Sequence, residues 1–304
     1  MLANERAYNR GMFGFLNVNK PVGPTSHDLV AGRRRRLGKG VKIGHTGTLD
    51  PKASGVLVLC VGPATRLSDY VQALPKRYLA TVTLGAVSST DDREGEITPT
   101  PGATPPTDEA LPTVLGRFVG EIQQVPPAHS AVHLATGGRA YKAASAGRDV
   151  DLAPRGVVVH AIDLISYAWP QLALEVACGS GTYIRSLARD IGAALGVGGY
   201  CSELTRTRVG PFGLAEAIAP DALDPARHLL PAQLAVPDFP RVVIGEADRF
   251  EINHGRGIAA PDSTPAGSEP FEVALEDACG ALVALAICRP AAGRIAPTKV
   301  FFGE

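Results

Sequence analysis

One aspartate stands where a glycine-rich loop meets an apolar run. Residues 42–55 read KIGHTGTLDPKASG, and residues 56–61 continue as VLVLCV, a pattern typical of a buried strand. Pro51 lacks an N–H and favours extended backbone at Asp50, which places the carboxylate at the mouth of that strand. Such a carboxylate can act as a nucleophile or base in a partly desolvated site. A turn aspartate or a helix cap is the commoner use of this residue type in such a loop.

A second candidate lies at the start of a predicted helix. Residues 182–195 are amphipathic, and Thr182 is placed to cap them. Arg185 falls in the first turn, where the helix dipole disfavours a cation. A local misfit of this kind indicates a functional position.

The sequence lacks the motifs for nucleotide, metal and disulfide sites. The chain has no GxxxxGK[ST] phosphate loop, no GxGxxG and no Cys/His pattern with zinc spacing. His129 and His133 are four residues apart, but they follow two prolines and have no third ligand nearby, so we expect no metal site. The five cysteines are scattered and odd in number, which favours reduced thiols over a disulfide framework.

The charges are unevenly distributed. The formal net charge is zero, yet residues 1–50 carry nine Lys and Arg against three Asp and Glu, and residues 238–304 carry six against ten. A basic N-terminal segment and an acidic C-terminal segment are typical of a protein that binds a phosphate backbone with one face. No run approaches the ~20 apolar residues that span a bilayer, and the first residues do not resemble a secretory signal. We therefore expect a cytoplasmic protein without a membrane partner.

The elements that must position these residues alternate between strands and helices. The patterns predict strands over residues 15–18, 76–84, 156–165 and 172–178, and helices over residues 26–37, 111–122 and 182–195. Residues 231–240 are rich in proline and indicate a hinge before further short strands. This proportion indicates an α+β fold, with a mixed, mainly antiparallel sheet and flanking helices.

Five segments together resemble the TruB-type tRNA pseudouridine synthases, which isomerise a uridine in the T-loop of tRNA. They are KPVGPTSHD at residues 20–28, GHTGTLDPKASGVL at 44–57, KRYLA at 76–80, GTYIRSL at 181–187 and LTRTRVGPF at 204–212. The segments follow the family's order and cover about the first 215 residues. The resemblance implies a catalytic domain at residues 1–236, with an RNA-clamping insertion at about 124–152. It also implies a small β-rich, PUA-like RNA-binding domain at residues 237–304.

The resemblance also implies roles for the catalytic residues. Asp50 attacks the base or abstracts a sugar proton, and the sequence leaves both routes open. Arg185 pairs with Asp50, and a neighbouring guanidinium lowers the pKa of a carboxylate and keeps it ionised. Tyr78 is the ring on which the target uracil stacks. Tyr183 lies near the base and relays the C5 proton.

Other residues are implied to meet the RNA. His45 enters the RNA fold and fills the space left by the flipped base. Leu204 packs against the uracil, although an ordinary core position suits it equally well. Lys20 contacts the substrate, and Arg139 and Lys142 belong to the clamping insertion.

The implied reaction is the conversion of uridine 55 of tRNA to pseudouridine. It is an isomerisation, so no cofactor is expected. The expected partner is the T-arm of tRNA, bound by a monomer without an obligate protein partner. Three alternatives stay open: the guide-RNA-dependent branch of the same fold, a tRNA-folding helper, and a hydrolase using Asp50. The hydrolase needs a second carboxylate, and nothing acidic falls between Asp50 and Asp69.

Overall fold

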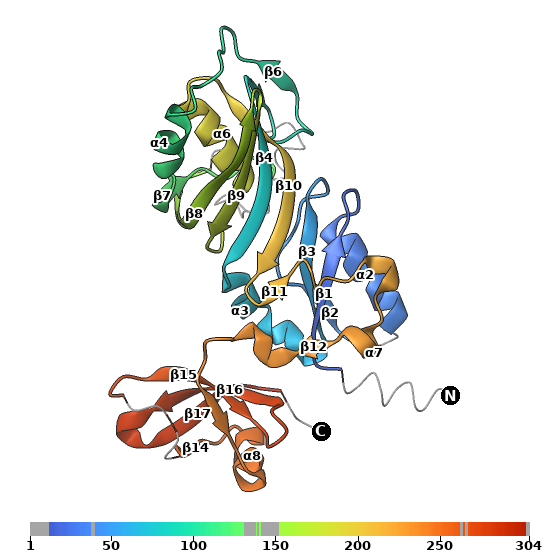
Figure 1. The fold of residues 1–304 in the computed structure, drawn as a ribbon. Coiled ribbons are helices and arrows are strands. Elements are labelled where there is room, and N and C mark those ends of the chain that lie inside the picture. Colours follow the sequence, from blue (N-terminus) through green and yellow to red (C-terminus); the bar gives the residue numbers. More distant parts are fainter. Residues whose placement is uncertain are drawn as a thin grey trace.

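The chain forms an elongated unit on a ten-stranded sheet and a smaller module on a five-stranded sheet (Figure 1). The computed structural model describes residues 12–37, 40–130, 138, 140, 152–261, 264 and 267–301, without the side chains of residues 35 and 36. The expected α+β class is confirmed: a mixed, mainly antiparallel sheet, few helices and a C-terminal β module. The division at residues 236 and 237 stays a prediction.

The large sheet has the strand order β12-β1-β3-β10-β4-β9-β8-β7, with β2 beside β3 and β11 beside β10. Its strands are β1 (Gly14–Lys20), β2 (Ile43–His45), β3 (Ser54–Val61), β4 (Lys76–Leu84), β7 (Gly120–Gln124), β8 (Arg155–Ala168), β9 (Gln171–Cys178), β10 (Gly199–Val209), β11 (Phe212–Gly213) and β12 (Leu230–Pro231). The pair of β3 and β10 is parallel, and it joins Gly55 to Arg206. This pairing brings the end of the Asp50 loop against the middle of the sheet.

The helices are short and lie between the strands. They are α2 (Ser26–Leu37), α3 (Ser68–Ala73), α4 (Ala110–Gly116), α6 (Ile184–Ala194), α7 (Pro225–His228) and α8 (Glu246–Asn253), with 3-10 turns η1 (Gly62–Leu67), η2 (Pro220–Ala222), η3 (Ala232–Ala235) and η4 (Pro290–Ala292). Thr25 and Asp28 cap α2 reciprocally: the Asp28 N–H donates to Thr25 Oγ1 at 3.1 Å, and the Thr25 N–H donates to Asp28 Oδ2 at 2.8 Å. No helix in the described part of the chain is long and apolar enough to cross a membrane.

Two predicted helix limits are wrong. The helix predicted over residues 111–122 ends at Gly116, and the strand β7 follows it. Gly120 adopts a φ of +102°, which redirects the chain between the two elements. Thr182 does not cap α6, because Tyr183 occupies the cap position and the Thr182 hydroxyl donates to Gly179 O at 3.3 Å.

The helix α6 is held closely against the sheet. Ile184, Leu187 and Ile191 of α6 are buried in one core with alternate residues of β4. Gly192 lets the helix approach β10, since a Cβ there would lie 2.3 Å from the N atom of Gly199. The missing side chain at Gly192 therefore allows the short distance between α6 and β10.

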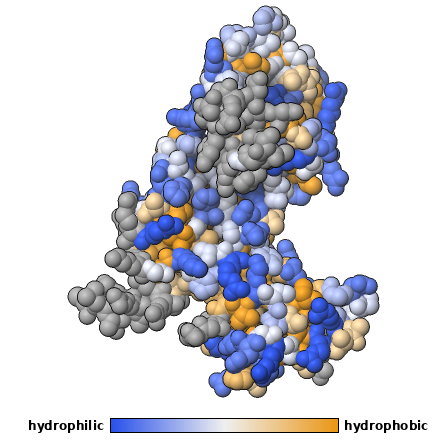
Figure 2. All heavy atoms as spheres, turned by 180° about the vertical axis from the view of Figure 1, so that it is seen from behind, coloured by the Kyte–Doolittle hydropathy of each residue, from blue (hydrophilic) through white to orange (hydrophobic). Residues whose placement is uncertain are grey.

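The C-terminal module has its own core and packs on the large unit. Its strands are ordered β13-β15-β16-β17-β14: β13 (Arg241–Val243), β14 (Ile258–Ala259), β15 (Phe271–Glu276), β16 (Leu282–Arg289) and β17 (Arg294–Val300). Tyr70 of α3 donates to Glu272 Oε1 at 2.9 Å, and the ring of Phe301 stacks on Phe13 at 5.1 Å. Seen from behind, the module shows hydrophilic and hydrophobic residues side by side on its surface (Figure 2). A short strand pair, β5 (Ala86–Ser88) and β6 (Ile97–Pro99), stands at the opposite end of the large sheet (Figure 1).

We expect Gly192→Ala to lower the free energy of unfolding by about 2–3 kcal/mol, because the added methyl group forces α6 away from β10. Urea denaturation measures the change. Gly116→Ala is the matched control: Gly116 also lies in a helix, and a Cβ there meets nothing within 4 Å. The control should be neutral or raise stability by about 0.5 kcal/mol. Equal effects of the two changes would contradict the close approach.

Candidate functional site

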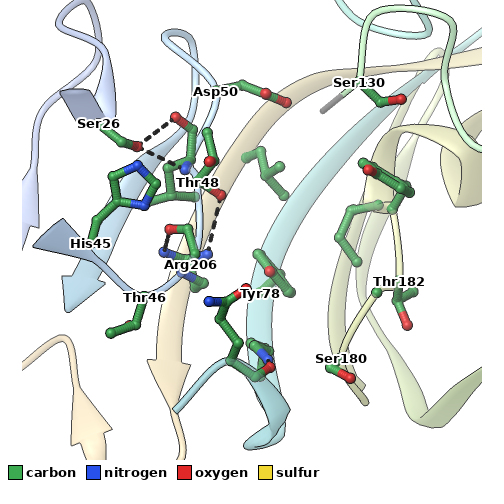
Figure 3. A pocket seen from close by; sticks show the side chains of 18 of the residues that line it. Ser26, His45, Thr46, Thr48, Asp50, Tyr78, Ser130, Ser180, Thr182 and Arg206 are labelled. Atoms are coloured by element: carbon green, nitrogen blue, oxygen red, sulfur yellow. Dashed lines mark hydrogen bonds between the residues drawn. The ribbon is translucent and has the colours of Figure 1, made fainter. Parts of the chain in front are cut away.

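A cavity of about 940 Å³ opens on the face of the large sheet, within the roughly 300–1,000 Å³ that small-ligand sites occupy. Figure 3 shows its walls: His45, Thr46 and Thr48 on one side, Ser180 and Thr182 on the other, with Tyr78 and Arg206 between them. Asp50 and Ser130 stand at the rim. The cavity therefore lies between the Asp50 loop and the start of α6.

Asp50 and Arg185, from distant parts of the sequence, form an ion pair in this cavity. Asp50 Oδ2 lies 2.9 Å from Arg185 Nε. The Asp50 side chain keeps 40% of its surface exposed, whereas the Arg185 side chain keeps 6%. The carboxylate is thus reachable from the cavity, while the guanidinium supports it from behind.

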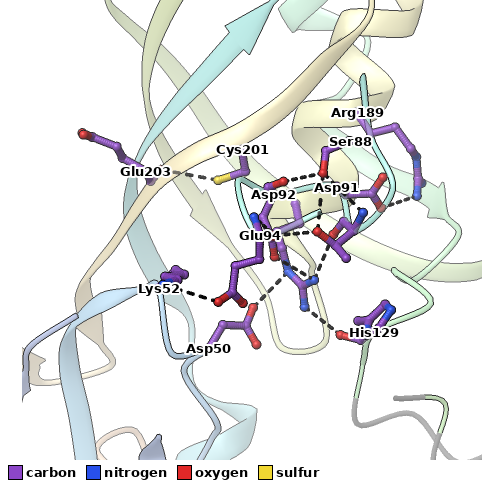
Figure 4. Close-up of polar contacts among 12 residues, drawn as sticks. Asp50, Lys52, Ser88, Asp91, Asp92, Glu94, His129, Arg189, Cys201 and Glu203 are labelled. Carbon is purple, nitrogen blue, oxygen red and sulfur yellow. Dashed lines mark hydrogen bonds and ion pairs between the residues drawn. The ribbon is translucent and has the colours of Figure 1, made fainter. Parts of the chain in front are cut away.

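The rest of the Arg185 guanidinium is also engaged. Nη1 lies 3.2 Å from Asp92 Oδ2 and donates to Thr90 O at 3.1 Å, and Nη2 donates to His129 O at 2.9 Å. Figure 4 shows Asp50, Asp92 and His129 converging on this one group. The buried guanidinium therefore holds all four acceptors in place.

Asp92 is a site residue that the sequence analysis missed. The absence of a second carboxylate near Asp50 holds only along the sequence, since folding brings Asp92 to the same guanidinium. Asp92 Oδ1 accepts hydrogen bonds from Thr90 Oγ1 at 2.6 Å and from the Glu94 N–H at 2.9 Å. Both oxygens of the Asp92 carboxylate therefore have partners within the protein, and Asp92 acts as a structural partner of Arg185. The two consecutive aspartates that end the segment at residues 85–92 were the only sequence signal for this role, and nothing in their spacing indicates a contact with Arg185.

Burial and neighbouring charges act on Asp50 in opposite directions. Burial raises the pKa of Asp50 above its ordinary value, Arg185 opposes that rise, and the negative charges of Asp92 and Glu94 add to it. The net pKa is raised because burial outweighs the guanidinium. Arg185 nevertheless acts in the expected direction.

Lys20 supports the Asp50 loop from within. Its side chain has no exposed surface, and Nζ donates to Pro21 O at 2.9 Å, Pro51 O at 3.2 Å and Ala53 O at 2.7 Å. Burial lowers the pKa of Lys20 to about 8. The predicted contact of Lys20 with RNA is therefore wrong for this structure, because its three donors face carbonyl groups inside the protein.

Arg206 holds the other end of the same loop, a role that the sequence analysis missed. Its side chain is buried in β10; Nε donates to Val56 O at 2.8 Å, and Nη2 donates to Gly47 O at 3.1 Å. A charged residue at an inward position of a strand was the available signal. Two buried cations, Lys20 and Arg206, thus fix the loop on both sides of Asp50.

Tyr78 and Leu204 form the floor of the cavity. Tyr78 is 8% exposed, and burial raises the pKa of its hydroxyl. It lies opposite Arg206 in the pairing of β4 with β10, while Leu204 lies two residues along β10 and is half-buried against two cores. The structure therefore places both residues among those that line the cavity.

Tyr183 and His45 line opposite walls. The Gln124 amide fixes the Tyr183 backbone, accepting from the Tyr183 N–H at 2.7 Å and donating to its carbonyl at 3.0 Å. Gln124 is a further residue that sequence reasoning missed. His45 ends β2, and its Nδ1 is buried with no hydrogen-bond partner among the described residues. Burial lowers the pKa of His45, which favours the neutral ring.

Arg139 and Lys142 fall outside the residues that the structure describes, as does most of the predicted clamping insertion. Among the described residues, no group of three or more His, Cys, Asp and Glu side chains could hold a metal ion.

Comparison with known proteins gives a consistent result. Residues 34–184 match the TruB family pseudouridylate synthase N-terminal domain, and residues 185–233 match the tRNA pseudouridylate synthase B C-terminal domain. The chain is 42% identical over 301 residues to tRNA pseudouridine synthase B of Arthrobacter sp. (strain FB24), covering 95% of this chain and 96% of the relative. It is 39% identical over 304 residues to that of Burkholderia mallei (strain ATCC 23344), covering 97% and 96%.

A solved structure shares the fold. A chain of a Cbf5-Nop10-Gar1 complex matches with a TM-score of 0.73 at 28% identity, covering 98% of this chain and 87% of that chain. From sequence matches that extend over nearly its whole length, the chain belongs to the TruB family of tRNA pseudouridine synthases, the enzymes that isomerise uridine in tRNA.

Proposed function

We propose that this enzyme converts uridine 55 in the T-loop of tRNA to pseudouridine, with Asp50 as the attacking or proton-abstracting group. The observation that carries the proposal is the Asp50 carboxylate, partly exposed at the rim of the cavity and 2.9 Å from Arg185. The reaction breaks N1–C1′ and forms C5–C1′. The C5 proton is lost and N1 gains one, so no group or electron is imported and no cofactor is required.

Both routes for Asp50 need an ionised carboxylate. It would either add to C6 of the uracil or remove a sugar proton before the base turns. Burial works against ionisation, and Arg185 works for it. Arg185 therefore acts on the reaction by holding the Asp50 carboxylate in place and by stabilising its ionised form.

The other wall residues suit a flipped base. A base that reacts inside a folded RNA loop must leave its stack, which costs a few kcal/mol. Stacking on an aromatic ring returns about 1–3 kcal/mol, and Tyr78 on the cavity floor offers that ring. Leu204 would cover the uracil edge, His45 would fill the vacated space in the RNA, and Tyr183 would relay the C5 proton.

The remaining assignments follow from this substrate. We assign residues 1–236 to catalysis, with the segment 124–152 clamping the T-arm, and residues 237–304 to a PUA-like domain. The separate core of the C-terminal module supports that division. The enzyme would act in the cytoplasm as a monomer, where it meets tRNA without a further protein.

Replacing Asp50 with Asn should abolish conversion, by on the order of 1,000-fold or more, because Asn keeps the size and loses the charge. The assay incubates unmodified tRNA transcript with the purified protein alone and measures pseudouridine by nucleoside chromatography. Asp69→Asn is the matched control, since Asp69 lines the same cavity from α3. We expect it to keep most of the activity.

Retention of more than a few per cent of activity in Asp50→Asn would refute the proposed role of Asp50. A wild-type protein that binds tRNA in a salt-sensitive way but forms no pseudouridine would favour the folding-helper alternative.

Removing the guanidinium should raise the pKa of Asp50 further. In Arg185→Gln the carboxylate loses its main counter-charge while Asp92 and Glu94 keep repelling it. Titration of the Asp50 carboxyl carbon by NMR should therefore show protonation at a higher pH than in the wild type. Activity that depends on the carboxylate is lost as the pH falls through this pKa, so any residual activity should also fail at a higher pH.

Arg77→Gln is the control for that titration. Arg77 forms an exposed ion pair with Glu175 at 3.4 Å, on the face of β4 opposite to Tyr78. It should leave the Asp50 titration unchanged. An unchanged or lower pKa of Asp50 in Arg185→Gln would show that the ion pair does not control the carboxylate.

A further inference from the structure

Arg155 is a cation on the cavity wall that pairs with no carboxylate among the described residues. It begins β8 and pairs with Gln124 of β7, the residue whose amide fixes the Tyr183 backbone. The Arg155 guanidinium lies 4.7 Å above the centre of the Tyr183 ring. Its Nη2 donates to Gly181 O at 2.5 Å. Arg155 is thus held in a defined orientation beside Tyr183.

The hydrogen-bonding capacity of this guanidinium is largely unfilled. Nε is buried with no partner, and among the described residues no carboxylate pairs with Arg155 and no acceptor meets Nη1. The other Lys and Arg side chains that line the cavity are buried and face protein acceptors: Lys76 meets Gln72 O, Arg185 meets the acceptors described above, and Arg206 meets loop carbonyls. Arg155 alone in this described set is half-buried and keeps an open donor edge.

An RNA substrate supplies the matching group. Each nucleotide brings a phosphate with two non-bridging oxygens, and the planar fork of arginine binds such oxygens with paired hydrogen bonds. A uridine inserted toward Asp50 and Tyr78 must bring its flanking phosphates to the cavity rim. Ser180 and Thr182 lie on the same wall (Figure 3), so this rim is polar and open to a backbone.

We propose that Arg155 binds the phosphate next to the target uridine and, by stacking on Tyr183, fixes that ring against the bound nucleotide. This inference rests on the proposed function, because it takes the inserted nucleotide as given. Binding of the phosphate would use Nη1 and the second hydrogen of Nη2 without breaking any contact that the fold makes. Arg155 is then a substrate-binding residue that also positions Tyr183.

The test combines a protein change with a change in one phosphate. Binding of T-arm RNA stem-loops is measured in the Asp50→Asn background, which prevents turnover. Each RNA carries one uncharged methylphosphonate linkage, placed on the 5′ or the 3′ side of the target uridine. With Arg155 present, one of these linkages should weaken binding by about tenfold. With Arg155→Gln, binding of the unmodified RNA should already be weaker by that factor, and the same linkage should cause no further loss.

Salt dependence separates a phosphate contact from a purely structural role. Loss of one phosphate contact should reduce the slope of log Kd against log salt concentration by about 0.7–0.9. Arg155→Lys should keep the slope because it keeps the charge, and Arg77→Gln, on the opposite face of the sheet, should also keep it.

An unchanged slope together with unchanged sensitivity to both linkages in Arg155→Gln would overturn the proposal, even if activity fell through a displaced Tyr183. Failure of the proposed function is detected separately, as absence of pseudouridine formation by the wild-type enzyme.

Discussion

The structure of the site depends on one buried guanidinium. The donors of Arg185 face Asp50, Asp92, Thr90 O and His129 O, which come from three separate loops. An arginine that is 5% exposed and always charged would destabilise the fold strongly if its donors were left unpaired. The loops are therefore brought together by a requirement of stability. The same requirement delivers the carboxylate to the cavity.

A second pair of buried cations explains how the Asp50 loop keeps its shape. Lys20 and Arg206 donate mainly to backbone carbonyls rather than to carboxylates. Their positive charges are therefore solvated by the loop but not neutralised by it. The formal net charge of zero therefore says little about the cavity, because the local arrangement of charges, not their sum, sets the potential there.

Local patterns predicted those parts of the fold that local forces decide. The strand over residues 76–84 was recognised at its observed limits, since its alternation matches the burial of β4. The cap of α2 follows from Thr25 and Asp28, three residues apart. Thr182 is not the cap because its hydroxyl donates to Gly179 O, while Gln124, far away in sequence, holds the backbone of Tyr183 at the cap position. Lys20 was assigned to RNA because no local pattern shows that a lysine will be enclosed by carbonyls.

The register of α6 connects these observations. One turn after Arg185, Arg189 Nη1 lies 2.8 Å from Asp91 Oδ2, so two arginines on one face of the helix hold two consecutive aspartates. Asp91 adopts a φ of +61°, which costs of order 1 kcal/mol or more in a residue with a Cβ. The Arg189 pair and the hydrogen bond from the Cys201 N–H to Asp91 O at 3.0 Å offset that cost. The turn at Asp91 directs Asp92 toward Arg185. The close contact of Gly192 with β10 fixes the position of α6 along the strand, and with it the positions of both arginines. The position of the Asp50 carboxylate thus depends on the packing of Gly192, about two turns along α6 from Arg185, as well as on its own loop.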